Sequence, residues 1–158
     1  MIVTRTEACD LITEMMNTEL NLEGEKLEKV ILACNSDLQV RDWLMGMPLR
    51  WSLEECIAFT QYMATHTTKD DSVPFVTVQA MYYYELDQIE KSVLLLNYAL
   101  QIDKEYALAK LLRRVVDSGW PSESFAAMRD ELDPKVIAAC YGEEGGTKIE
   151  SEGRVQNV

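Results

Sequence analysis

The sequence predicts an all-α protein, a single helical domain of about seven helices. Apolar residues recur at three- and four-residue intervals along most of its 158 residues, as they do on one face of a helix. Residue types typical of helix starts and ends separate these stretches. Strand-like alternation of apolar and polar residues is missing over any convincing length, and only the β-branched run VPFVTV at 73–78 comes near to it.

Helical stretches follow one another in the first third of the chain. Residues 6–20 have apolar side chains at helical spacing, and Thr4 or Thr6 stands where an N-cap belongs. A second stretch covers residues 22–34. The triplet Asn-Ser-Asp that follows supplies stop and restart signals, so a third helix is expected over residues 38–45.

A capping box predicts the start of the fourth helix. Ser52 and Glu55 are three positions apart, so each side chain can accept a hydrogen bond from the other residue's free backbone amide. Residues 65–72, THTTKDDS, are polar enough to form a loop but too few to separate two domains.

Residues 74–119 have the pattern of a paired-helix repeat of the tetratricopeptide type, followed by a third helix. Such a pair needs small or aromatic residues where its helices approach closely, and a short loop is available at Leu86 to Gln88. The residues at the close-approach positions are Ala80 and Tyr83 on the first helix and Ser92, Leu96 and Ala99 on the second.

The repeat is expected to occur once. Moving ahead by the 34-residue period of this repeat class places Arg114 at the small-residue position that Ala80 occupies. Gly119 is suited to the left-handed residue after a helix, and Pro121 prevents continuation of that helix. An extended superhelix of repeats is therefore not predicted.

The last part of the chain predicts two shorter helices and a tail. One helix covers residues 122–132, and Asp133 followed by Pro134 is expected to start a last helix that ends at Gly142. Residues 1–142 would then form the helical domain. Residues 143–158 lack the apolar density that offsets the entropy of ordering, so we expect a flexible acidic tail unless a partner or strand pairing orders it.

Composition excludes several classes of protein. A formal charge of −12, from 27 acidic and 15 basic residues, disfavours direct binding of nucleic acid. The amino terminus does not resemble a secretory leader, and no window approaches the roughly 18 apolar residues of a membrane span. We expect a cytoplasmic protein whose four isolated cysteines are buried thiols, since no pair has the spacing of a zinc or redox motif.

No pattern for catalysis is present, so an enzyme is not expected. His66 is the single histidine and lies in a polar loop, where a surface role is the simplest interpretation. Asp70 and Asp71 are adjacent, so their carboxylates project to different sides and do not form a calcium loop. Paired glycines occur only at 145–146, without the strand and helix of a phosphate-binding loop. We therefore predict no metal and no cofactor.

Candidate partner-binding residues lie on the first helix of the repeat-like pair. Its three consecutive tyrosines, at 82–84, are about 100° apart and so span about 200° of a helix, and we do not expect all three to enter one core. The positions that match the ligand-facing set of a tetratricopeptide repeat are Thr77, Met81, Tyr84 and Glu85. The alternative is that the first four helices cover and bury this surface.

Residues 36–135 resemble the C-terminal half of an uncharacterised domain family of actinobacteria and their phages, whose members end in a tetratricopeptide-like helical region. The matching phrases are SDLQVRDW, AMYYYELD and SVLLLNYALQIDKEYALAKLLRRVVDSGWP. This chain departs from the family at Leu86 to Gln88, where a Gly-Asp turn is usual, and at Lys104, where a proline is usual. The resemblance implies a shortened, stand-alone copy and supplies no catalytic residues, because none are assigned in that family.

Two functions follow as hypotheses. The first is a non-enzymatic protein-protein interaction module of an actinobacterium or its phage, which binds a cytoplasmic protein, and the acidity favours a partner with a basic surface. The second is a phage-encoded acidic inhibitor that occupies a nucleic-acid-binding surface of a host enzyme. It is motivated by the charge of −12 and the shortened family match. The identity of the partner and the oligomeric state stay open.

Overall fold

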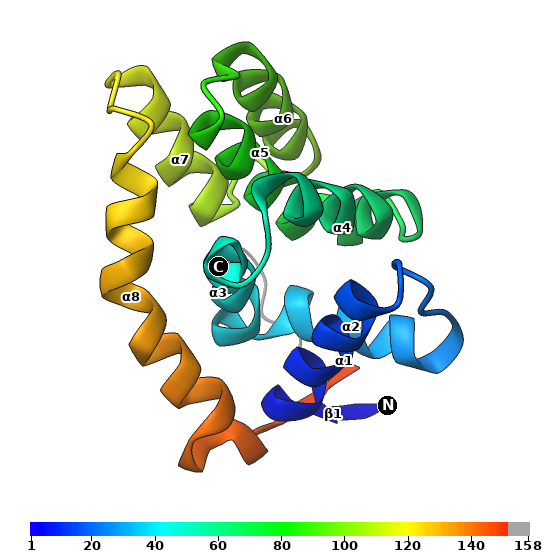
Figure 1. Ribbon diagram of the computed structural model, residues 1–158. Helices are drawn as coiled ribbons and strands as arrows, with labels where there is room; N and C mark the ends of the chain where they lie inside the picture. Colours follow the sequence, from blue (N-terminus) through cyan, green and yellow to red (C-terminus); the bar gives the residue numbers. More distant parts are fainter. Residues whose placement is uncertain (152–158) are drawn as a thin grey trace.

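The computed structural model describes residues 1–151 and consists mainly of α-helices (Figure 1). The all-α prediction is confirmed, with eight α-helices in the described residues against the expected seven or so. The helices are α1 Arg5–Asn17, α2 Gly24–Ser36, α3 Leu38–Gly46, α4 Leu53–Thr65, α5 Val73–Glu85, α6 Ile89–Ile102, α7 Ala107–Asp117 and α8 Ser124–Tyr141. Short 3-10 turns are η1 Met47–Leu49, η2 Asp70–Ser72 and η3 Glu143–Gly146, and the strands are β1 Ile2–Thr4 and β2 Lys148–Glu150.

Local capping sets the helix starts in the N-terminal half. The Thr4 hydroxyl accepts a hydrogen bond from the backbone N–H of residue 7 at 3.1 Å, which begins α1. Asp37 caps α3 by accepting from two backbone amides at 2.9 and 3.1 Å. Ser52 and Glu55 make both hydrogen bonds of the capping box, at 3.1 and 3.2 Å. These caps satisfy amides that a helix start leaves free, as the sequence indicates.

Helix α8 differs from the prediction of two helices that meet at Asp133 and Pro134. It continues through Pro134 as one helix of 18 residues. Pro134 is exposed, so water can solvate the carbonyl that loses its helical partner. Asp133 lies inside this helix and so does not cap one, and its carboxylate accepts a hydrogen bond from Arg50 at 2.9 Å. Close approach between α3 and α8 depends on Gly46, where a Cβ would collide with the Asp133 carboxylate.

Part of the expected flexible tail is ordered. Residues 143–146 form η3, and β2 pairs antiparallel with β1 in a register that places Val3 opposite Ile149. Both of these side chains are buried. The strand is only three residues long, too short for an alternating pattern to be recognised in the sequence. The strand pairing that we considered as an ordering mechanism therefore occurs within the chain itself, and residues 152–158 lie outside the described part.

Helix α5 is the most enclosed element of the fold. Eleven of its 13 residues are buried, and it packs against α4 and α6, with further contacts to α3, α7 and α8 (Figure 1). A helix that is apolar on all sides is typical of such a central position. At its centre the Tyr82 hydroxyl donates a hydrogen bond to the carbonyl of Leu44, and burial raises the pKa of Tyr82 well above its ordinary value.

Two leucines on α6 provide a matched test of this packing. Leu96 is fully buried, whereas Leu94 is 68% exposed. We expect Leu96→Ala to lower the free energy of unfolding by about 3 kcal/mol, since it removes buried methyl groups and leaves a cavity. Leu94→Ala should change it by less than about 0.5 kcal/mol. Urea denaturation measures both, and equal losses would contradict the orientation of α6.

Candidate functional site

An apolar groove of about 440 Å³ lies between α7 and α8, and we call it the α7–α8 groove. Figure 1 shows α7 and α8 leaving their connecting loop in diverging directions. The apolar wall residues are Leu108, Leu111, Leu112 and Val115 on α7 and Phe125, Met128, Leu132 and Val136 on α8. Met45 of α3 and Met81 of α5 line its base, and Trp120 lies at the end where the two helices are connected.

The wall residues form two apolar stripes with helical spacing. On α7 they lie at positions i, i+3, i+4 and i+7, and on α8 at i, i+3, i+7 and i+11. Each stripe therefore follows one face of its helix, and both faces line the same groove. Such a stripe normally packs against another helix in the core. Here the two stripes are held apart.

Part of this apolar surface is open to solvent. Leu111, Trp120 and Leu132 are 48%, 49% and 43% exposed, respectively, whereas Leu112 and Phe125 beneath them are buried. Single exposed apolar residues are common on proteins, but several that border one concave site are typical of a binding surface. The groove is therefore the strongest candidate for a functional site among the described residues.

Charged residues border the groove and are mostly paired within the chain. Arg41 contacts the Asp42 carboxylate at 2.9 Å, and its guanidinium lies 5.9 Å from the ring centre of Tyr106. Burial acts to lower the pKa of Arg41, but attraction to Tyr106 and Asp42 raises it overall, so the guanidinium stays charged. Lys135 is exposed and has no ion pair within the described residues. The groove is thus apolar inside and polar at its border.

The structure buries the side chains of the four residues predicted to bind a partner. Thr77 is fully buried, and its hydroxyl donates to the carbonyl of Val73 at 2.7 Å. Met81 lines the base of the groove. The Tyr84 hydroxyl donates to the carbonyl of Trp120, and its ring contacts the ring of Phe125 edge-on with centres 5.3 Å apart. The open walls of the groove are formed by α7 and α8, which lie outside the predicted set, and of the four predicted residues Met81 contributes to its lining.

Glu85, the fourth predicted residue, forms a buried ion pair with Arg129 of α8. Both side chains are only 6% exposed, and the two carboxylate oxygens accept from both terminal nitrogens of the guanidinium, one of them at 2.8 Å. Arg129 also donates from Nε to the carbonyl of Met45 at 2.6 Å. One side chain therefore joins α8 to α5 and α3, which fixes the position of one wall of the groove.

The α7 wall of the groove could have been predicted from the amphipathic pattern of its sequence, but the repeat pattern favoured a different helix. The segment ALAKLLRRVVD places its apolar residues on one side of a helix and its basic residues on the other. Tetratricopeptide positions direct attention to the first helix of a pair, here α5. A search for amphipathic helices alone would have selected α7.

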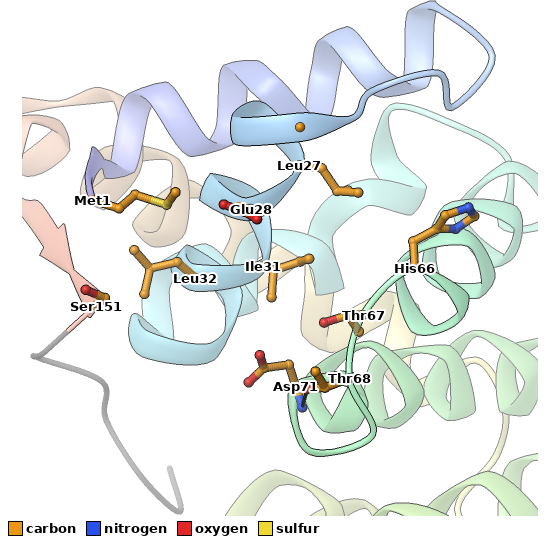
Figure 2. A pocket seen from close by; sticks show the side chains of 11 residues that line it. Met1, Leu27, Glu28, Ile31, Leu32, His66, Thr67, Thr68, Asp71 and Ser151 are labelled. Carbon is orange, nitrogen blue, oxygen red and sulfur yellow. Dashed lines mark hydrogen bonds between the residues drawn. The ribbon is translucent and has the colours of Figure 1, made fainter.

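A second, more open cavity of about 640 Å³ lies beside α2. Figure 2 shows Leu27, Glu28, Ile31 and Leu32 of α2 along it, with Met1 and Ser151 at one end and His66 at the other. His66 stacks on Tyr62 with ring centres 3.9 Å apart, and its Nδ1 lies 2.8 Å from the Tyr62 carbonyl oxygen. Within residues 1–151 no three His, Cys, Asp or Glu side chains are placed to hold a metal ion.

No protein-family model matches the chain, and no curated protein or solved structure is similar to it. None of the helices within the described part is both long and apolar enough to cross a membrane. A function for the chain has to be inferred from the geometry of the described residues.

Removal of Arg129 tests the role of the buried pair. Arg129→Met leaves the Glu85 charge buried without its partner, so we expect a loss of about 3 kcal/mol in the free energy of unfolding. The double variant Glu85→Leu with Arg129→Met should recover much of that loss, though not the hydrogen bond to the Met45 carbonyl.

Urea denaturation measures these changes. Lys26→Met is the matched control, since Lys26 forms an ion pair with Glu14 in which both side chains are exposed, and its loss should cost less than about 1 kcal/mol. If the double variant is no more stable than Arg129→Met, the unpaired charge of Glu85 is not the cause of the loss in the free energy of unfolding.

Proposed function

We propose that this protein is a non-enzymatic, helical protein-interaction module that binds an amphipathic helix of a cytoplasmic protein in the α7–α8 groove. The observation that supports it is the pair of apolar stripes that line one groove, with Leu111, Trp120 and Leu132 about half exposed. A helix-in-groove complex uses such surfaces, because the apolar face of the incoming helix replaces water on both walls.

The shape of the groove favours a helix as the occupant. Each wall is itself a helix, and side chains of a third helix can pack between rows of side chains that have the same period. The 11 residues of α7 are about 16 Å long, which corresponds to roughly three turns of a bound helix. Anchors at positions i, i+3 or i+4 and i+7 of the partner would match this length.

We also propose that α5 and α6 are a tetratricopeptide-like pair, in agreement with the family resemblance described for residues 36–135. Ala80, Ser92, Leu96 and Ala99, at the expected close-approach positions, are buried. Asp87, in the loop between the helices, has a φ of +60°, so this aspartate occupies the left-handed region that a glycine would occupy in the family. In such repeats the ligand-binding face is lined by the first helix of each pair and the helix that follows the pair. Here these helices would be α5 and α7, and α8 packs against part of that face.

The second candidate, an acidic inhibitor that occupies a nucleic-acid-binding surface, is favoured by the charge of −12. The two functions differ in their response to salt. Binding through clustered charges weakens steeply as ionic strength rises, whereas burial of apolar surface does not. Competition with DNA for a nucleic-acid-binding enzyme at low salt would support the inhibitor and count against the groove.

Peptide selection tests the groove directly. The probe is a display library of helical peptides with apolar residues at i, i+3, i+4 and i+7, selected against the full chain. We expect Leu111→Asp and Leu132→Asp to weaken the selected peptides at least about tenfold, which corresponds to about 1.4 kcal/mol. Both residues are partly exposed, so the fold should tolerate the change.

Leu94→Asp is the matched control, because Leu94 is an exposed leucine on α6, outside the groove. Its affinity for the selected peptides should equal that of the unchanged protein, as measured by fluorescence anisotropy. Peptides that bind both groove variants normally would contradict the proposal. A groove that binds small apolar dyes but no helical peptide would instead indicate a small-molecule site.

A further inference from the structure

Five charged residues line the α7–α8 groove, and four of them form ion pairs within the chain. The pairs are Arg41 with Asp42, Asp133 with Arg50, and Arg129 with Glu85. The fifth is Lys135 of α8, which is exposed, and its ammonium has no ion pair or hydrogen bond within residues 1–151. Neither the fold nor the apolar contacts of the proposed function give this charge a role.

Both carboxylates in the groove already have a cation of their own. Asp42 accepts two hydrogen bonds from the Arg41 guanidinium, at 2.9 and 3.2 Å. Asp133 accepts from Arg50 through Oδ2 at 2.9 Å. Its other oxygen, Oδ1, is buried against Gly46, where a Cβ would lie only 2.2 Å from it. A basic side chain of a partner would therefore find no unpaired carboxylate among the described residues that line the groove, although the chain has a net charge of −12.

Lys135 lies toward the end of the groove that is remote from Trp120. It directly precedes Val136, the last wall residue of α8, and follows the partly exposed Leu132 by three positions, so it flanks the apolar stripe of this helix. Glu131, four positions earlier on α8, does not line the groove and forms no ion pair with Lys135. The groove therefore has an apolar end at Trp120 and one positive charge without a partner near its other end.

We propose that the partner helix in the α7–α8 groove carries an acidic side chain that pairs with Lys135, at the end of the groove remote from Trp120. This pairing rests on the proposed function, since it requires a helix in the groove. The incoming helix removes water from the Lys135 ammonium, and a carboxylate is the group that best replaces those water contacts. Because Lys135 lies near one end only, the ion pair also fixes the direction and register of the bound helix. The net charge of the chain favours basic residues on the solvent-facing side of that helix.

Two peptide selections test this pairing, one against the unchanged full chain and one against Lys135→Glu. The library is the helical one with apolar residues at i, i+3, i+4 and i+7, and its flanking positions are randomised. We expect aspartate or glutamate to be enriched at one flanking position with the unchanged protein, and lysine or arginine at the same position with Lys135→Glu. Lys69→Glu is the matched control, because Lys69 is an exposed lysine outside the groove that has no ion pair within the described residues. It should select the same peptides as the unchanged protein.

Charge reversal on both sides measures the size of the effect. Replacement of the acidic residue of a selected peptide by lysine should weaken its binding to the unchanged protein roughly two- to fivefold, as expected for an ion pair at the border of a groove. The same lysine peptide should recover most of that affinity on Lys135→Glu. Fluorescence anisotropy gives the dissociation constants at low and at high salt, and the difference between the two peptides should shrink as salt rises.

The possible failures are distinguishable. Helical peptides whose flanking residues are the same for the unchanged protein and for Lys135→Glu would overturn the pairing and leave the groove as the binding site. Enrichment of basic residues at the position that responds to Lys135→Glu, with the unchanged protein, would overturn the pairing as well. Failure to select any helical peptide would overturn the proposed function and the pairing with it.

Discussion

The buried ion pair between Glu85 and Arg129 is the interaction on which the rest of the structure depends. Neither charge can be left without a partner in a site that excludes water, so α8 must bring Arg129 to α5 whenever the chain is folded. The same guanidinium satisfies the Met45 carbonyl of α3. This requirement holds the first half of α8 against α5 and α3, while α7 packs mainly on α6. The α7–α8 groove is a consequence of that arrangement.

Helix α8 takes part in most of the contacts described above. The groove wall extends along α8 from Phe125 to Val136, and the same stretch carries Arg129 and, against Gly46 and Arg50, Asp133. Its last turn carries Cys140 and Tyr141 against α1. A single 18-residue element thus joins the groove wall to helix α1 at its other end. The groove wall and the contacts with α1 lie on the same helix because α8 continues through Pro134.

The sequence predicted those parts of the structure that depend on neighbouring residues. The caps at Thr4, Asp37 and Ser52 involve atoms only two or three positions apart, so residue types alone indicate them, although Thr6 was an equal candidate for the first. By contrast, the ion pair of Glu85 is formed across 44 positions and the β1–β2 ladder across the whole domain. The repeat pattern selected the face of α5 that would meet a ligand if this helix belonged to a tetratricopeptide repeat. It could not show that α8 of the same chain covers it, because nothing local encodes that contact.

The pairing of β1 with β2 also has a consequence for synthesis of the protein. Val3 leaves the ribosome 146 residues ahead of Ile149, its partner in the ladder. At elongation rates of about 5–20 residues per second this delay is on the order of 10 s, far longer than helix formation requires. Helices α2 to α7 therefore have time to pack against one another while β1 is still unpaired. The ladder can form only after residue 150 has emerged, so β1 spends that interval without its final neighbour.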